Sequence, residues 1–291
     1  MTANLTPQEF SNLREFIHQR CGILLGDDKA YLIEHRLAKL LEEQHCKTFG
    51  ELYFKAKNDQ RTGNLSLAIV DAITTNETFW FRDQRVFDLL REVILPALYQ
   101  EVAKGQRETI RLWSAACSTG QEPYSLAMVA QDFFRAHGGE DACRRHVKIL
   151  ATDISPSALA SACQGVYNNL SMGRGLPESH LDRFFQRREG GLWEVRDSLR
   201  SLVEFRQHNL RDPMVGFGVF EVVALRNVTI YFSEEVKRQL FSRLTKALVP
   251  GGHLFLGTGE TLGFFSKAFD LQDYQGMNYY RLPPRPAPAA A

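Results

Sequence analysis

Two short segments carry residues that could bind a cofactor. The loop from Ala115 to Gly120 is built of small residues and follows an apolar, strand-like run, as cofactor-binding loops do in doubly wound folds. Asp153 ends a second run of this kind, where a carboxylate can accept hydrogen bonds from two ribose hydroxyls. An ordinary helix N-cap or loop acid would explain Asp153 equally well.

The loop also restricts which cofactor fits. It lacks the Gly-Lys-Ser/Thr ending that cradles polyphosphate, and it is not a GxGxxG pyrophosphate turn. A nucleoside cofactor with a ribose and no phosphate fits both segments, so we favour S-adenosylmethionine over NAD. Cys117, inside the loop, is interpreted as a small packing residue, with a nucleophile as the alternative. The chain has five cysteines and no CxxC pair, so neither a disulfide framework nor a metal site is expected.

The composition is that of an ordinary globular protein. Hydrophobic residues make up 44% and charged residues 24%, and 35 Lys and Arg nearly balance 34 Asp and Glu. The net charge of +1 gives no argument for a nucleic-acid partner. No run approaches 18 apolar residues and no secretory signal is visible, so we expect a cytoplasmic protein without membrane insertion.

Helical patterns fill the first quarter of the chain. Thr6, Pro7 and Glu9 form a helix start signal of N-cap, first-turn proline and capping-box acid. Apolar residues at helical spacing then predict further helices over 29–44, 49–57 and 65–72. These patterns predict a helical domain over residues 1–72, followed by a linker over 73–90.

Strands alternate with helices from residue 109 onward. Strands are expected over 109–114, 147–153, 217–225 and 253–257, and helices over 123–135, from 155, and over 233–248, where 250–252 (Pro-Gly-Gly) should stop the last helix. This alternation predicts an α/β fold with a largely parallel sheet, a Rossmann-like domain over 91–282. Residues 184–207 should form an inserted antiparallel β-subdomain with a Gly-Gly turn, and 283–291 a disordered tail.

Six motifs in order resemble the CheR family of chemotaxis methyltransferases. The similarity covers roughly residues 5–282, with three departures: Trp80 stands for the usual Phe, Ala224-Leu225 for the usual Phe-Cys and Gly259 for the usual Ser. The motifs are Thr74-Thr75-Asn76-Glu77-Thr78-Phe79-Trp80-Phe81-Arg82, the run 112–125 around Cys117-Ser118-Thr119-Gly120-Gln121-Glu122, Leu150-Ala151-Thr152-Asp153, His208-Asn209-Leu210, Arg226-Asn227-Val228-Thr229-Ile230-Tyr231-Phe232, and Gly257-Thr258-Gly259-Glu260.

The resemblance implies an S-adenosylmethionine site with a role for each matched position. Asn76, Thr78 and Arg82 would line the methionine end of the cofactor from the linker. Glu122 would meet the methionine amino group, for which a carboxylate is the natural partner. Asp153 would hold the ribose hydroxyls.

The later motifs would complete the same site. Asn209 would border the adenine by an amide hydrogen bond and Leu210 by apolar contact. Arg226 and Asn227 would close the pocket near the methionyl carboxylate. Tyr231 would stand near the transferred methyl group.

The implied reaction moves a methyl group to a receptor glutamate and leaves S-adenosylhomocysteine. A sulfonium is already activated and a glutamate is ionised at pH 7, so no general base is needed. Alignment and exclusion of water should supply most of the acceleration. Arg82 is our first choice as the catalytic orienter of the carboxylate, or as a cofactor anchor, and Tyr231 is the second choice. An interdomain salt bridge would also explain Arg82, and packing would explain Tyr231.

The implied partner is the cytoplasmic helical domain of a chemotaxis receptor. Its acidic faces would suit a basic surface, for which Arg36 and Lys39 are candidates because they share a helix face; a solvated face explains them too. The short turn within 184–207 favours direct recognition over a peptide tether, and we expect a monomer. Two other hypotheses stay open: a methyltransferase acting on a different carboxylate, and a module that senses the cofactor without turnover.

Overall fold

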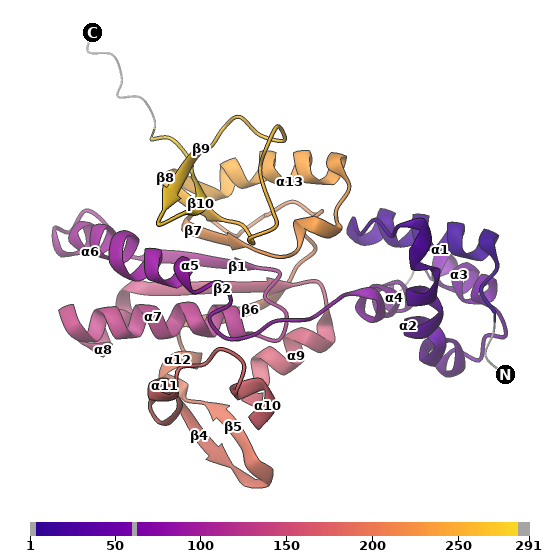
Figure 1. Cartoon of the computed structure of the whole chain (residues 1–291), viewed down its shortest axis with the longest axis horizontal. Helices are drawn as coiled ribbons and strands as arrows, with labels where there is room; N and C mark the ends of the chain where they lie inside the picture. Colours follow the sequence, from indigo (N-terminus) through magenta and orange to yellow (C-terminus); the bar gives the residue numbers. More distant parts are fainter. Residues whose placement is uncertain (1–3, 60–62, 285–291) are drawn as a thin grey trace.

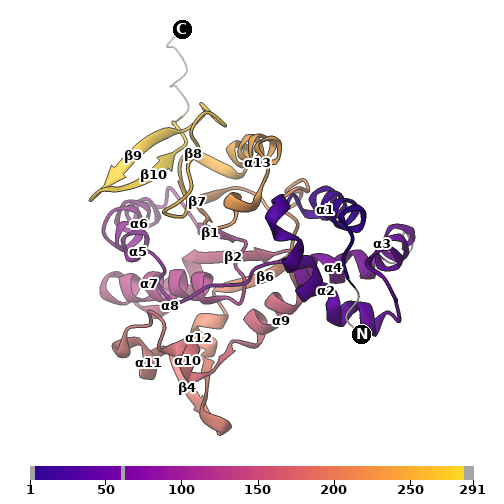
Figure 2. The same ribbon diagram turned by 45° about the vertical axis from the view of Figure 1, so that its right-hand side comes forward.

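A helical unit opens the chain and lies beside the rest of the molecule (Figures 1 and 2). The structure is a computed structural model that describes residues 4–59 and 63–284. The unit has its own apolar core, built on residues such as Leu13, Ile17, Ile33 and Leu37. Its elements are α1 (Pro7–Cys21), η1 (Asp27–Lys29), α2 (Ala30–Glu43), α3 (Phe49–Asn58) and α4 (Asn64–Ile73).

The start of α1 follows the sequence signal. The Thr6 hydroxyl accepts a hydrogen bond from the Glu9 backbone N–H at 3.3 Å, and the Glu9 carboxylate accepts one from the Thr6 N–H at 2.9 Å. This reciprocal pair satisfies N–H groups that lack partners in the first turn. The predicted capping box is therefore confirmed.

A seven-stranded sheet forms the centre of the molecule, in the order β6-β2-β1-β7-β8-β10-β9. The first five strands of this order pair in parallel, and the last two add an antiparallel edge. The strands are β1 (Ile110–Ala115), β2 (Val147–Asp153), β6 (Val203–Gln207), β7 (Phe220–Leu225), β8 (Leu248–Phe255), β9 (Asp270–Tyr274) and β10 (Met277–Arg281).

Helices cover both faces of this sheet (Figure 1). In β1, Ile110 and Leu112 join one apolar cluster, while Trp113 and Ala115 join the other, as the two-residue period of a strand requires. The first cluster includes side chains of α5 (Gln84–Leu89), its π-helical continuation η2 (Leu90–Ile94), α6 (Leu95–Ala103), α7 (Gln121–His137) and α8 (Glu140–His146). The second includes side chains of α13 (Glu234–Ala247), and α9 (Pro156–Gln164) packs on β2 and β6.

The expected linker is partly helical. Residues 84–90 form α5 and the start of η2, and their side chains Val86, Phe87 and Leu89 are buried in the core of the larger domain. Only the stretch from 74 to 83 runs without a helix or strand between the helical unit and α5. That stretch contains the first of the six motifs.

A separate three-stranded antiparallel sheet has the order β3-β5-β4. It comprises β3 (Val166–Tyr167), β4 (Phe185–Arg188) and β5 (Leu192–Val195), with the turn η3 (Glu189–Gly191) where the Gly-Gly turn was expected. The short helices α10 (Asn169–Met172), α11 (Glu178–Phe184) and α12 (Asp197–Arg200) surround it.

The predicted extent of this subdomain needs correction at its end. Residues 203–207 are β6, which pairs in parallel with β2 in the central sheet rather than with β4 or β5. The reason is that Val203 and Phe205 place their side chains against Leu159 of α9 and the neighbouring strand. Alternating apolar residues indicated a strand correctly but could not indicate which sheet it joins.

The Pro250-Gly252 segment differs from its predicted role. Helix α13 already ends at Ala247, and β8 runs through the segment instead of starting after it. The pairing of β8 with β7 shifts between Phe220 and Val222, so the extra residues bulge out of the ladder. Gly251 and Gly252 keep backbone hydrogen bonds to Leu282, which supports the strand through the bulge.

The chain leaves the sheet after β10. Of the tail predicted over 283–291, residues 285–291 lie outside the described residues. Within 4–59 and 63–284, no helix has the length and hydropathy needed to cross a bilayer.

Candidate active site

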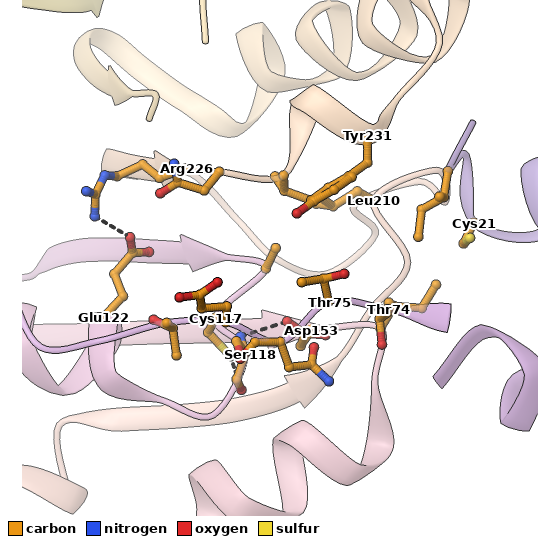
Figure 3. A pocket seen from close by; sticks show the side chains of 18 of the residues that line it. Cys21, Thr74, Thr75, Cys117, Ser118, Glu122, Asp153, Leu210, Arg226 and Tyr231 are labelled. Carbon is orange, nitrogen blue, oxygen red and sulfur yellow. Dashed lines mark hydrogen bonds and ion pairs between the residues drawn. The ribbon is translucent and has the colours of Figure 1, made fainter. Parts of the chain in front are cut away.

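A pocket lies at the carboxyl ends of β1, β2 and β7, facing the helical unit (Figure 3). The chain proceeds from β1 to β2 and β6 on one side, while β7 pairs with the other side of β1. In open α/β sheets, ligands bind at this kind of switch in strand order. Cys21, the last residue of α1, and Ile23, which follows it, line the pocket from the side of the helical unit.

The fold brings the predicted site residues to this one pocket. Its lining includes every residue expected to bind the cofactor or act in catalysis: Asn76, Thr78, Arg82, Glu122, Asp153, Asn209, Leu210, Arg226, Asn227 and Tyr231. These residues come from five separate segments of the chain. Arg36 and Lys39 are not among the lining residues.

Asp153 is held at the end of β2 by backbone hydrogen bonds. Its carboxylate accepts from the Ser118 N–H at 2.7 Å and from the Ser155 N–H at 2.9 Å. Burial raises the pKa of this carboxyl group, and these two hydrogen bonds oppose the rise. The N-cap of α9 is Ser155, whose hydroxyl accepts from the Ala158 N–H at 3.0 Å. Asp153 is therefore not the helix cap, and it faces the pocket.

Arg226 occupies the inner end of the pocket between two acids. Its guanidinium donates to the Glu122 carboxylate at 2.7 Å and to the Asp83 carboxylate at 2.7 Å, and it also contacts the Arg82 carbonyl. The other oxygen of Glu122 accepts from the Ser114 hydroxyl at 2.7 Å. The arginine is buried, so this ion-pair network fixes the floor of the site (Figure 3).

Arg82 differs from Arg226 in having no acidic partner among the described residues. Its guanidinium lies 5.5 Å from the centre of the Phe79 ring and donates one long hydrogen bond, at 3.4 Å, to the Glu77 carbonyl. The described residues thus provide no interdomain salt bridge for Arg82. A half-buried cation in the pocket wall is available for a carboxylate.

Tyr231 lies across the pocket from Asp153 and Thr75 (Figure 3). It ends the 3-10 turn η4 (Thr229–Tyr231), and its carbonyl accepts from the Leu24 N–H at 2.8 Å. The side chain is 37% exposed, so it is not a core packing residue. Its position at the edge of the pocket is open to an incoming substrate.

Asn209 makes two hydrogen bonds that the sequence did not predict. Its amide N–H donates to the Arg20 carbonyl at 2.7 Å, and its amide oxygen accepts from the Arg211 N–H at 3.0 Å. The side chain therefore joins the end of α1 to the larger domain, although Asn209 lines the pocket. A hydrogen bond from adenine to the Asn209 amide would have to form beside these two bonds or replace one of them. Leu210 can contact adenine through its apolar side chain, which lines the pocket.

Comparisons with known proteins agree with the site. The family model described as "CheR methyltransferase, all-alpha domain" matches residues 8–74, and "CheR methyltransferase, SAM binding domain" matches residues 76–276. Together the two models cover almost all of the described chain. The chain belongs to the CheR methyltransferase family.

Named relatives are similar over nearly their full lengths. Chemotaxis protein methyltransferase 1 of Pseudomonas aeruginosa is 46% identical over 254 residues, which is 87% of this chain and 90% of that protein. Chemotaxis protein methyltransferase Cher2 of Pseudomonas putida is 43% identical, with 90% and 92% covered. The Escherichia coli chemotaxis protein methyltransferase is 31% identical, with 96% and 92% covered. The expected fold class, the methyltransferase activity and the use of S-adenosylmethionine are confirmed.

The ribose role expected for Asp153 gives a direct prediction. Replacing Asp153 by alanine should weaken binding of S-adenosylhomocysteine by roughly 1.5–3 kcal/mol, since hydrogen bonds to a charged group are lost. Titration calorimetry measures the difference. Asp132→Asn is the matched control, because Asp132 is a half-buried acid on α7 that bonds His180 and lies outside the pocket. Equal affinities of wild type and Asp153→Ala would show that the ribose role is wrong.

Arg36 serves the linker rather than a free surface. Its guanidinium contacts the Ile73 carbonyl and donates to the Thr74 carbonyl at 3.1 Å and the Thr75 hydroxyl at 3.0 Å. Lys39 is 85% exposed at its side chain and pairs with Glu43 at 3.4 Å. The shared helix face was predicted correctly, but only Lys39 presents its charge to solvent.

Cys117 is a packing residue in this CheR-family protein. It is buried beside Ala151 and Leu159, and burial raises the pKa of its thiol far above the ordinary range, with Asp153 and Glu122 adding to the shift. A thiolate nucleophile is thus disfavoured.

One important acid was not singled out from the sequence. Glu260, quoted only as part of the last motif, accepts hydrogen bonds from the whole loop that follows β7. Its position after the glycines of 257–259 was the only available signal. Without a fold, nothing related that position to Asn227 and Tyr231.

Proposed function

We propose that this CheR-family enzyme transfers a methyl group from S-adenosylmethionine to glutamate side chains of chemotaxis receptors. The products are glutamyl methyl esters and S-adenosylhomocysteine. The proposed site of action is the cytoplasmic helical domain of the receptor, recognised directly by a monomer. Relatives named chemotaxis protein methyltransferase support this acceptor.

One observation supports a carboxylate acceptor most strongly. Arg82 lines the pocket without an acidic partner in the described residues, whereas Arg226 is neutralised by two acids. A planar guanidinium pairs with a carboxylate through two parallel hydrogen bonds. An incoming glutamate can therefore be held by Arg82, which lines the same pocket as Tyr231.

The chain's own groups then need only to position the reactants. When bound, the cofactor supplies an electrophilic methyl group on a sulfonium. In this proposal Asp153 and Glu122, which line the same pocket as Arg82, hold its polar ends, and Arg82 aims the glutamate oxygen along the line of transfer. The glutamate is ionised at neutral pH, so no residue has to remove a proton.

Docking of a receptor helix involves the helical unit in this proposal. Lys39 offers an exposed charge on α2 for an acidic helix face. Arg36 lies on the same face of α2 and contributes by holding residues 73–75, of which Thr74 and Thr75 line the pocket.

Transfer of label from the cofactor tests the proposal. The protein is incubated with methyl-labelled S-adenosylmethionine and receptor cytoplasmic fragments, and label released by mild base is counted as methyl ester. We expect base-labile label on the fragments and none on fragments whose acidic glutamates are changed to alanine. If every receptor stays unlabelled while the enzyme binds its cofactor, the acceptor is a different carboxylate or the protein is a sensor.

A further inference from the structure

The Glu260 carboxylate binds backbone N–H groups that follow the ends of two neighbouring strands, β7 and β8. It accepts hydrogen bonds from five backbone N–H groups and one hydroxyl. The donors are the N–H groups of Asn227 (2.6 Å), Val228 (3.0 Å), Thr229 (2.6 Å), Ile230 (3.3 Å) and Gly257 (2.7 Å), and the Thr229 hydroxyl (2.7 Å).

Both oxygens of Glu260 are needed for this arrangement. Oε2 accepts from the N–H groups of Asn227 and Gly257, and Oε1 accepts all the other bonds. Gly257 allows the close approach of these groups, because a Cβ at this position would lie 2.5 Å from the side-chain Nδ2 of Asn227 and 2.8 Å from Glu260 Oε2. The carboxylate has no cationic partner among the described residues, so the backbone N–H groups and the Thr229 hydroxyl stabilise its charge.

The loop held by Glu260 carries pocket residues at both ends. Asn227 lies in the left-handed region with φ 58°, a conformation that needs support in a residue with a side chain. Tyr231 follows four residues later, and both side chains line the pocket. Glu260 itself is outside the lining, so it acts on the pocket through this loop.

We propose that Glu260 is a positioning residue for methyl transfer. Its carboxylate holds the loop 227–231 in the conformation that places Asn227 and Tyr231 in the pocket. The inference rests on the proposed function only for the choice of acceptor in the assay. It concerns how the loop is shaped, not which protein is methylated.

The substitution Glu260→Gln is the most direct test of this positioning role. Either orientation of its amide leaves at least two backbone N–H groups facing an NH₂ group instead of an oxygen, so the loop must shift. We expect kcat for labelling of receptor fragments to fall by about 10- to 100-fold, the effect of a small misplacement in the site. The Kd for S-adenosylhomocysteine should rise by a much smaller factor, because Asp153, Glu122 and Arg82 are untouched.

Glu221→Gln is the matched control. Glu221 is 3% exposed at the opposite end of β7, and it also accepts a backbone N–H, that of Arg111, at 2.6 Å. It lies far along the strand from the pocket and does not line it. We expect the control to lower the melting temperature, as Glu260→Gln does, while kcat stays near the wild-type value.

Thr229→Val provides a milder version of the same change. It removes one hydroxyl donor to Glu260 while keeping the size of a buried side chain, so it should fold even if Glu260→Gln does not. We expect a smaller loss of kcat in the same direction.

Equal kcat in wild type and a folded Glu260→Gln protein would overturn the inference. So would equal losses of kcat in Glu260→Gln and Glu221→Gln, or a Thr229→Val protein that melts earlier with unchanged kcat. Labelling by the wild-type protein is read in the same assay. A wild type that labels no receptor contradicts the proposed function instead, and the loop is then tested with the acceptor that is labelled.

Discussion

Replacement of Arg226 by methionine is expected to lower the free energy of unfolding by about 2–4 kcal/mol, because it leaves two partly buried acids, 13% and 34% exposed, without their cation. Glu122 and Asp83 each bond this guanidinium at 2.7 Å, and the Arg226 side chain is almost fully buried. Methionine fills a similar volume but donates no hydrogen bond. Urea unfolding of the cofactor-free protein, followed by circular dichroism, measures the loss.

A second substitution separates lost charge balance from lost packing. Glu122→Gln in the Arg226→Met background removes one of the stranded charges, so part of the stability should return. Arg91→Met is the matched control, since Arg91 also pairs with two acids, Asp88 and Glu92, on an exposed helix surface. Exposed pairs contribute little, so its loss should be much smaller. Similar losses for Arg91 and Arg226 would contradict the buried network.

Replacement of Arg82 by alanine is expected to lower kcat by about 100- to 1000-fold, the usual cost of removing one preorganised donor at a reacting group. The guanidinium lines the pocket and has no acid to neutralise it in the described residues. If Arg82 orients the glutamate, the Kd of S-adenosylhomocysteine should stay nearly constant. If it anchors the cofactor, that Kd should rise together with the fall in kcat.

Arg174→Met is the control for this prediction. Arg174 lies over the same Phe79 ring, 5.4 Å from its centre, but it pairs with Glu77 and does not line the pocket. Its loss should leave kcat close to the wild-type value. Arg82→Lys should fall between wild type and alanine, because an ammonium keeps the charge but not the paired donors. A wild-type kcat in the Arg82→Ala enzyme would contradict the proposal that Arg82 orients the glutamate.

Short-range patterns predicted most of the elements. The Thr6 cap placed α1, and the run over 147–153 gave the bounds of β2. The predictions were wrong where one local sequence signal is compatible with two different tertiary arrangements. Pro250 can end a helix or lie in a strand bulge. The strand at 203–207 could join either sheet by its sequence, and packing of its side chains against α9 decides for the central sheet.

The site was predicted as a set of residues but not as a set of contacts. Resemblance to the CheR family pointed to Arg226 and Glu122 together, yet no pattern showed that they pair with one another, 104 residues apart in the chain. Asn209 lines the pocket as expected, but no pattern showed that its amide also bonds a carbonyl 189 residues away. Such contacts depend on the packing of the helical unit against the sheet.

The sequence by itself determined the family, the cofactor class and the list of pocket residues. It could do so because helix caps, strand alternation and motif order are local properties of the chain. Only the tertiary structure decided how each charge is used: Arg226 buried between two acids, Arg82 left available, and Glu260 closed around a loop. Hydrogen bonding and burial determine the chemistry of a charged group, and both come from segments that meet only when the chain folds.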